Sequence, residues 1–497
     1  MKTTQLPKLA LALLALVPLS VLALDSGSTG SDDVFNPSVN TERQVPASGV
    51  FNFTTVNIPS GVKVTFKKNA TNTPVVILAT GDVTIAGTID ISGGNAAAAG
   101  AAGDGNIGDD GVPGLGGPGG YDGGRGGAAN YGRAGAGIGP GAGAGGHGCA
   151  TSASVFGGPA TVGGAGAGFG TAGIALTVTA TFTCSGTSFV APAPGATYGS
   201  SQLLPLVGGS GGGGAAGGPS FAGSGGGGGG GSILIAANGT VTVTGSVLAN
   251  GGKGGDTSGA GAGANGGGGS GGAIRIIARA IAGNGTISAT GGAVGARTST
   301  SGPTYVDGSA AGTGRIRLES ETFTRTAATT PAYTFSQPGT VFVAGLPTLR
   351  ISRVAGTDAP LAPTGNGDVV LPASTLNPVT VEFATTGVPV GNTVKLTVTP
   401  SSGAASTAVS GALTGTTQSA SASVSVTLPA GPSILSAQTT YTIVAALGDE
   451  LSRYANNERV EKVRLEAAIG GTSSVTLITA SGNEYQVPQA VLAGLGG

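Results

Sequence analysis

The amino-acid sequence predicts an all-β protein: a parallel β-helix (solenoid) with a large glycine-rich insertion, followed by a β-sandwich domain. Three observations predict it. Strand-like segments anchored at Ile233, Ile274 and Ile316 lie 41 and 42 residues apart. Glycine supplies 100 of the 497 residues and is densest between residues 95 and 231, so this tract differs in kind from its surroundings. From residue 346 onward, glycine thins and alternating strands recur at the spacing of a sandwich.

The composition favours an ordered extracellular protein over a disordered one. Charged residues make up only 9% of the chain and the mean hydropathy is +0.27, whereas disordered chains are charged and poorly apolar. A net charge of −1, the lack of tryptophan and an aromatic content of 4% provide neither a basic field nor stacking platforms for nucleic acid. We therefore expect no nucleic-acid partner.

Residues 1–23 have the pattern of a secretory signal peptide. Lys2 and Lys8 precede the apolar stretch LALALLALVPLSVLA, and Val21 and Ala23 suit the small-residue positions before a cleavage site. The alternative is a membrane anchor, but the stretch is shorter than the ~20 apolar residues that a span needs. We expect a secreted or extracellular protein whose mature form has no membrane span.

Residues 50–340 carry the repeated unit, after a polar, turn-rich stretch at residues 24–49 that predicts a flexible lead. Each unit has an apolar strand, a turn, a short strand that begins G-[TS]-[IV], and a glycine-rich loop. Such a unit cannot bury its apolar face alone. Successive units are therefore expected to stack in parallel around a common core.

The phrases GDVTIAGTIDISGG, GSVLANGG and GTISATGG repeat the second half of this unit. Their layout resembles the N-terminal half of secreted right-handed β-helix proteins and, more loosely, the haemagglutinin-type repeats of bacterial surface adhesins. The resemblance covers about a fifth of the chain. It implies a parallel β-helix, and either an adhesin or a polysaccharide-cleaving enzyme, because those families contain both.

The insertion, residues 95–231, keeps glycine at every third position from Gly105 to Gly126. A three-residue period is what an extended helix with three residues per turn needs when neighbours approach one face closely. One interpretation is a bundle of polyglycine-II-like helices within one chain. The other is a mobile glycine-rich loop, because glycine loses more backbone freedom on ordering than other residues.

Two cysteines, Cys149 and Cys184, lie within this insertion. In an oxidising compartment they could form a disulfide, and the alternative is a pair of idle thiols. Residues 346–497 follow as an immunoglobulin-like or fibronectin-like β-sandwich, in which alternating segments such as VTVEF and TVKLTVT are the strands. The first half of residues 449–468 suits a short helix.

Three arginines are the candidate ligand-binding residues. Arg275 and Arg317 occupy the same outward position on successive units, and Arg315 faces the same way because strand side chains alternate. Stacked strands are about 4.8 Å apart, so the three cations would form a cluster suited to an anionic polysaccharide. The alternative is that Glu319 and solvent neutralise the cluster.

Acidic residues in the insertion offer a candidate calcium site. Asp104, Asp109 and Asp110 supply carboxylates of the kind that calcium prefers, although their spacing matches no calcium-binding loop. The alternative is a solvated acidic turn. No other cofactor is expected.

No catalytic residue is assigned. GHG at 146–148 and DD at 109–110 resemble motifs of polygalacturonase-type hydrolases, but RIR at 315–317 departs from the usual Arg-Ile-Lys. Inverting hydrolysis also needs two carboxyls held about 6.5–9.5 Å apart on a rigid frame, and a glycine-rich stretch is a poor frame.

The function expected is that of a secreted or cell-surface structural or adhesive protein without catalysis. Its partners would be extracellular polysaccharide or cell-surface components, with self-association as a further prediction. Two alternatives remain. One is a polysaccharide-cleaving β-helix lyase or hydrolase. The other is an ice- or mineral-binding protein, which a wall of outward threonines such as Thr84 and Thr242 would favour.

Overall fold

The structure is a computed structural model. The residues that it describes are 24–46, 48–69, 72–100, 111–151, 159–176, 182–184, 187–189, 191–259, 261–298, 304–339, 341, 347–360, 367–443, 445–456, 458–469, 474–487 and 489–492. The predicted signal peptide, residues 1–23, lies outside this part of the chain. Regular structure is nearly all β, as the sequence predicts. The described residues contain no helix long and apolar enough to cross a membrane.

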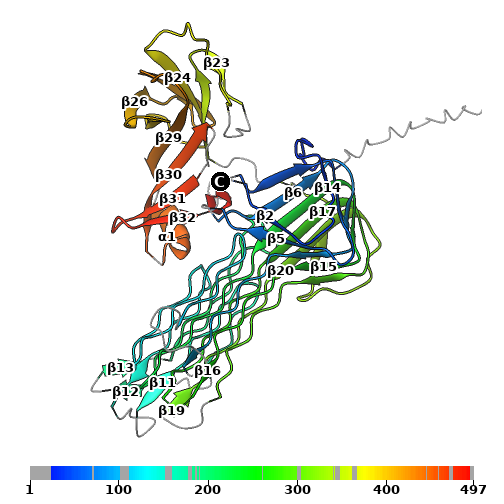
Figure 1. Ribbon diagram of the computed structural model, residues 1–497, viewed down its shortest axis with the longest axis vertical. Helices are drawn as coiled ribbons and strands as arrows, with labels where there is room; N and C mark the ends of the chain where they lie inside the picture. The colour runs from blue at the N-terminus through cyan, green and yellow to red at the C-terminus, as the bar shows by residue number, and fades with distance from the viewer. Residues whose placement is uncertain are drawn as a thin grey trace, which may run out of the picture.

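Two parallel sheets form the first body, which we call the strand stack (Figure 1). The larger sheet has nine strands: β1 (Val34–Phe35), β3 (Val50–Phe53), β4 (Thr55–Ile58), β6 (Val75–Ala79), β7 (Val83–Ile85), β14 (Ser232–Val243), β17 (Ala273–Ala282), β20 (Arg315–Phe323) and β21 (Thr334–Ser336). The smaller sheet has five: β2 (Thr41–Gln44), β5 (Lys63–Lys67), β8 (Thr88–Asp90), β15 (Ser246–Leu248) and β18 (Thr286–Ser288). The chain passes repeatedly from one sheet to the other, with one or two strands in the larger sheet for each strand in the smaller sheet.

The predicted repeat sets the register of the larger sheet. Ile233 of β14 lies opposite Ile274 of β17, which lies opposite Ile316 of β20. All three side chains are at most 2% exposed and belong to one apolar cluster with residues of the smaller sheet. Burying each such side chain contributes about 1.5–3 kcal/mol, so the register that aligns them is strongly favoured.

Residues 24–49 do not form a flexible lead. Strands β1 and β2 lie within them and pair in parallel with β4 and β5, so they add a first layer to the strand stack. These strands are only two and four residues long and mostly half-buried or exposed, which leaves little apolar periodicity for the sequence to reveal.

The larger sheet is buried on its outer face as well. Leu234, Ala236 and Ile277 point away from the core of the strand stack and pack in a second cluster with Phe169 and Leu203. Burial on both faces explains the nearly continuous apolar runs SILIAA and AIRIIA, because strands covered on both sides lose the polar alternation.

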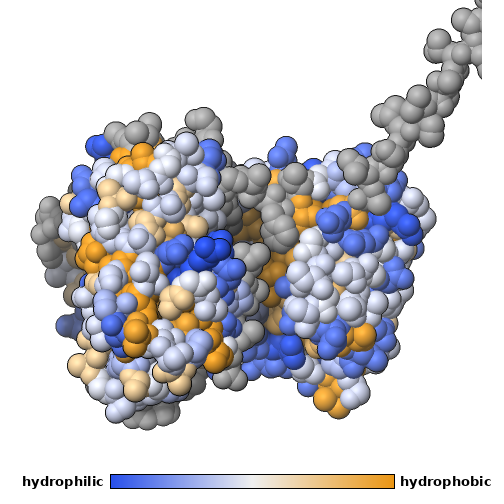
Figure 2. Space-filling model, turned by 90° about the horizontal axis from the view of Figure 1, so that it is seen from above, coloured by the Kyte–Doolittle hydropathy of each residue, from blue (hydrophilic) through white to orange (hydrophobic). Residues whose placement is uncertain are grey.

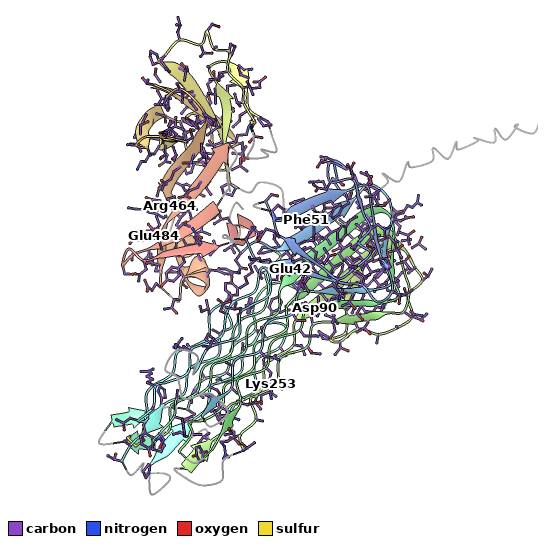
Figure 3. All side chains as sticks on the ribbon, viewed as in Figure 1. Glu42, Phe51, Asp90, Lys253, Arg464 and Glu484 are labelled. Atoms are coloured by element: carbon purple, nitrogen blue, oxygen red, sulfur yellow. A yellow bond between two sulfur atoms is a disulfide. The ribbon has the colours of Figure 1, made fainter. Side chains whose placement is uncertain are left out.

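Glycine-rich excursions from the strand stack form the second body, which we call the glycine bundle (Figure 1). The predicted insertion supplies most of it, but residues 249–272 and 289–314 join the same bundle. The chain therefore leaves the strand stack three times and returns to it three times. Side chains are sparse along this body and crowded on the other parts of the molecule (Figure 3).

Hydrogen bonds between extended segments hold the bundle together with a period of three. Along residues 211–217, every third N–H donates to the same neighbouring segment, and the carbonyls accept in the same way. The six neighbours of this central segment are residues 132–138, 162–165, 224–230, 121–127, 143–146 and 264–270. This is the packing of the polyglycine-II-like interpretation, and the mobile-loop interpretation is wrong for the described residues.

Close approach of backbones explains the period of glycine. A Cβ on Gly123 would lie 2.0 Å from the carbonyl oxygen of Gly226, and one on Gly126 would lie 1.9 Å from that of Gly223. Both distances are far below contact, so these positions have no room for any side chain. Gly105 and Gly108, where the period begins, lie outside the described residues.

Short strands mark the end of the bundle far from the strand stack, which we call the tip (Figure 1). They are β9 (Ala99–Gly100), β10 (Gly148–Cys149), β11 (Ala160–Val162), β12 (Phe182–Cys184), β13 (Thr187–Phe189), β16 (Thr257–Ser258) and β19 (Thr304–Val306). The end that packs on the strand stack is the base.

Two antiparallel sheets form the C-terminal body. One comprises β22 (Thr348–Val354), β23 (Thr357–Asp358), β24 (Val379–Thr386), β27 (Thr414–Thr416) and β28 (Ser419–Val426). The other comprises β25 (Thr393–Pro400), β26 (Ser406–Ala412), β29 (Ser433–Thr442), β30 (Val460–Ile469), β31 (Ser474–Thr479) and β32 (Glu484–Val487). They share an apolar core that includes Val381, Phe383, Leu396 and Leu465.

The helical elements are α1 (Ala445–Leu451), η1 (Ser452–Tyr454) and η2 (Gln489–Leu492). Helix α1 begins four residues before the predicted start. Seen from above, exposed hydrophobic residues are scattered over the strand stack and the C-terminal body rather than gathered on one broad face (Figure 2).

Candidate functional site

Arg275 and Arg317 do lie side by side, but they do not form a ligand-binding cluster. They are register partners on β17 and β20, and both bind the same carboxylate. Glu319 Oε1 lies 2.9 Å from Nε of Arg275 and 2.7 Å from Nε of Arg317. The side chains of Arg275 and Glu319 are 3% and 1% exposed, so a ligand could not reach this pair. The binding role predicted for Arg275 and Arg317 is therefore wrong.

The cause is that other parts of the chain cover this face. The N–H of Gly339 donates to Oε2 of Glu319, and Nη1 of Arg275 contacts the carbonyl oxygen of Val341. Burial alone would raise the pKa of Glu319, but hydrogen bonds from Arg275, Gly339 and Arg317, with the charge of Arg275, hold it below its ordinary value. Glu319 is thus a carboxylate that stays ionised inside the protein.

Arg315 likewise has a structural position. Its Nη2 donates to the carbonyl oxygen of Tyr198 at 3.1 Å, and its guanidinium lies 5.7 Å from the ring centre of Phe169. Tyr198 and Phe169 belong to the base of the glycine bundle, where their ring centres are 4.6 Å apart. Arg315 therefore joins the bundle to the strand stack, and its binding role stays a prediction.

The candidate calcium ligands Asp104, Asp109 and Asp110 lie outside the described residues, so that site stays a prediction. Within the part of the chain that the structure describes, no group of three His, Cys, Asp or Glu residues is placed to hold a metal ion.

Cys149 and Cys184 form a disulfide, with their Cα atoms 5.8 Å apart. The bond joins β10 to the β12–β13 hairpin at the tip. It closes a loop of the chain in a region where little apolar core is available. The bond stabilises this region by restricting the unfolded chain.

The tip carries a small sheet that positions an aromatic and charged group. Strands β10, β11 and β19 are paired, and Tyr305 of β19 lies opposite Thr161 of β11. Next to them, Nε of Arg297 lies 2.7 Å from Oδ1 of Asp307. The same guanidinium stands 4.6 Å from the ring centre of Tyr305, a cation–π distance. Ring, cation and carboxylate are thus held in one fixed arrangement.

Tyr131 completes this group from a neighbouring turn. Asn130 and Tyr131 have φ values of 60° and 62°, so both residues of the turn are left-handed. The turn is tied to the bundle by the N–H of Tyr131, which donates to the carbonyl oxygen of Gly218. Partial burial raises the pKa of Tyr131, and the nearby phenol of Tyr305 raises it further. We call Tyr131, Arg297, Tyr305 and Asp307 the tip cluster.

A second surface lies on the outer face of the β22–β24–β28 sheet. A shallow hollow of about 680 Å³ there is lined by Arg350, Arg353, Glu382 and several serine and threonine residues. Nε of Arg353 is 2.6 Å from Oδ1 of Asp358, so one of its two cations is already paired. Phe383, the aromatic residue in its lining, points into the core and is 0% exposed.

The outward hydroxyls of the strand stack form only short rows. Thr84 and Thr242 are register partners, but Asn57 continues that row on one side. Thr88, Ser246 and Thr286 form a second row, which Lys63 ends. Rows interrupted in this way do not make the extended regular array that the ice- or mineral-binding alternative needs.

The sequence analysis did not single out the tip cluster. A signal was present, because Tyr131 follows the position at which the three-residue glycine period breaks, and Arg297 and Tyr305 lie in a later stretch with little glycine, residues 296–307. Arg297 and Tyr305 could be brought together only by knowing that their segments are neighbours at the tip.

Comparison of the chain with known protein families, with curated proteins and with solved structures finds no match.

Proposed function

We propose that this protein is a secreted or cell-surface structural and adhesive protein. In this proposal the strand stack is a short parallel β-helix that serves as a platform, and the C-terminal body is an immunoglobulin-like or fibronectin-like sandwich. The glycine bundle projects from the platform and presents its tip to extracellular polysaccharide or to a cell surface.

The observation that carries the proposal is the construction of the bundle. Its central segment, residues 208–218, has hydrogen-bonded neighbours on six sides, which makes a stiff rod rather than a loop. Eleven residues at ~3.1 Å per residue span roughly 30 Å, so the tip stands well clear of the platform. Three separate excursions of the chain build this one rod. Ordering so many residues costs conformational entropy that a simple connection between two strands would not require.

The balanced charge of the chain favours a protein that presents a surface for contact over one that attracts its ligand electrostatically from a distance. The chain has 22 basic and 23 acidic residues, so no net field draws a partner to it from a distance. Ion pairs within the bundle, Lys253 with Asp256 and Arg297 with Asp307, join residues that are close in the sequence. Binding by such a protein would rest on short-range contacts at a defined surface.

The test is a binding experiment with the full chain produced by secretion. Purified protein is incubated with insoluble polysaccharides and with intact cells that carry different surface glycans, and the bound fraction and any released sugar are measured. We expect saturable binding to at least one surface with no release of reducing ends. Absence of binding to every surface would contradict adhesion, and depolymerisation would favour the enzyme alternative.

A further inference from the structure

We infer that the tip cluster is a glycan-binding surface, and that its ligand is a sugar chain bearing carboxylate groups. This inference rests on the proposed adhesive function and names the surface and the ligand class through which it would act. Four steps carry it, each from the geometry of described residues.

The first step is where the aromatic rings lie. Among the described side chains of the glycine bundle, rings occur only at its two ends. At the base, Phe169 and Tyr198 are buried in an apolar cluster that includes residues of the strand stack and the C-terminal body, and Tyr121 is half-buried. At the tip, Tyr131, Phe221 and Tyr305 are all only partly buried. The base rings anchor the rod, whereas the tip rings have a face toward solvent and no large core to serve.

The second step is the backbone at Tyr131. A left-handed conformation is costly for a bulky residue, about 1–3 kcal/mol, and is nearly free for glycine. The surrounding chain uses glycine at most such positions, for example Gly111, Gly119 and Gly139. Tyr131 adopts this conformation at φ 62°, although glycine would serve the turn at a lower cost. Its presence there therefore points to a role for the aromatic ring.

The third step is the chemistry of the group. A sugar ring presents a face of C–H groups, which packs against an aromatic ring, and a rim of hydroxyls, which bind planar charged groups. The tip cluster supplies both, because the guanidinium of Arg297 stands over the ring of Tyr305 and pairs with the carboxylate of Asp307. Tyr131 adds a second ring at the same end of the bundle, near enough for its phenol to interact electrostatically with that of Tyr305. Arg133, exposed two residues after Tyr131, adds a cation that favours a sugar carboxylate.

The fourth step is rigidity. Arg297 is held between the carboxylate of Asp307 and the ring of Tyr305. Tyr305 is itself fixed because it lies in β19, which pairs with β11. The Cys149–Cys184 bond closes the adjacent loop. A surface fixed before binding loses little freedom when a flexible glycan settles on it, so a few contacts suffice for useful affinity.

The experiment compares variants of the full chain on an array of acidic and neutral polysaccharides. Tyr131→Gly removes the ring and relieves the left-handed strain, so folding should be preserved or improved. Tyr305→Ala removes the second ring, and Leu115→Ala is the matched control, because Leu115 is a 66% exposed apolar side chain on the shaft of the bundle. We expect at least about tenfold weaker binding for the two tip variants and unchanged binding for the control.

The outcomes separate the inference from the function on which it rests. If the wild-type chain binds a polysaccharide and Tyr131→Gly binds it equally well with an equal melting temperature, the tip is not the surface and adhesion stands. If binding is lost at the tip but is indifferent to sugar carboxylates, the ligand class is wrong. A wild-type chain that binds no glycan on the array overturns the inference, and its binding to intact cells then decides whether the adhesive function stands.

Discussion

Glu319 is the carboxylate on which the arginines of two neighbouring strands converge. It is 1% exposed and accepts hydrogen bonds from Arg275, Arg317 and the N–H of Gly339. A buried charge is tolerated only when it is paired and hydrogen-bonded, and each of these groups depends on the others. This set of residues therefore stabilises the contact between the strand stack and the parts of the chain that cover it.

Glu319→Gln should destabilise the protein strongly. The variant leaves Arg275 buried without its counter-charge, and breaking a buried pair typically costs about 3–5 kcal/mol. Urea denaturation followed by circular dichroism measures the loss. Removing both charges with Arg275→Met and Glu319→Leu should restore most of it, because paired hydrophobic replacements are often neutral.

The control is Asp358→Asn, in the exposed pair with Arg353, which should change the stability little. Equal effects of Glu319→Gln and Asp358→Asn would show that the buried pair has no special role.

The same residue should make stability depend on pH. The pKa of Glu319 is lower in the folded protein than its ordinary value of 4.5. Its stabilisation is then complete above that ordinary value and is lost as the pH falls through the folded pKa. Melting temperatures between pH 7 and pH 2.5 should fall less steeply for Glu319→Gln than for the wild type. Parallel curves for the two proteins would contradict this prediction.

The three arginines also show what sequence reasoning could not reach at this scale. The repeat correctly predicts that Arg275 and Arg317 are neighbours on the outer face. That this face is covered depends on residues 198–207, which lie far away in the chain, and on Gly339 and Val341. One feature of the sequence indicates that this face is covered. The apolar run around Arg275 is typical of a strand that is buried on both faces.

Among elements, the glycine bundle is the one whose order depends on a single residue type. An extended segment surrounded on six sides by other backbones has room for a small side chain at a few positions, such as Ala215 and Ala216, and for a hydrogen atom only at the others. An added methyl group is therefore tolerated or rejected according to the direction in which it points. The distance from a built Cβ to its nearest neighbour therefore predicts the effect of each substitution.

Gly123→Ala should disrupt the bundle, and Gly135→Ala, which needs only a small adjustment of its neighbour, should have a much milder effect. The first methyl would lie 2.0 Å from a buried carbonyl oxygen, whereas the second would have no neighbour nearer than 3.3 Å. Overpacking of this kind costs about 1–3 kcal/mol or more, while a tolerated Gly→Ala change can stabilise by about 0.4–1 kcal/mol. Melting temperatures measure both. A matched loss in the two variants would mean that close packing does not determine the role of glycine here.

The disulfide should act on the tip rather than on the whole protein. Cys149 and Cys184 are 35 residues apart, and the chain-entropy model gives about 4 kcal/mol for closing such a loop. In the double variant Cys149→Ser and Cys184→Ser, amides of β10 and β11 should exchange faster with solvent deuterium, and those of β14 and β17 should be unchanged. Faster exchange throughout the strand stack would contradict this local role.

How far the elements could be predicted depends on their periodicity. The repeat predicts the strands at Ile233, Ile274 and Ile316, because long apolar runs at equal spacing leave few alternatives. The strands within residues 24–49 are short and polar, so they are read as a lead. The bundle could only be offered beside a mobile loop, since its stability comes from hydrogen bonds between segments rather than from any pattern within one segment.

At the scale of the whole molecule, charge has a small part in stability. The bundle is held by backbone hydrogen bonds, and the cores of the strand stack and the C-terminal body are apolar. Ion pairs other than those of Glu319, such as Lys63–Asp90 and Lys253–Asp256, are at least partly exposed, and exposed pairs contribute little. Raising the salt concentration from 0.1 to 1 M should therefore leave the melting temperature nearly unchanged or raise it slightly. A clear drop, measured by calorimetry in sodium chloride, would mean that ion pairs hold the bodies together.

Hydrogen exchange of the bundle's central segment tests the central claim most directly. Mass spectrometry of the peptides between Leu206 and Phe221 and between Phe221 and Ile233 reports on the N–H groups that donate to neighbouring segments. If the bundle is the ordered rod described, these glycine amides should exchange as slowly as those of β14 in the strand stack. Exchange at the rate of an unstructured peptide would contradict the rod, and with it the display of the tip.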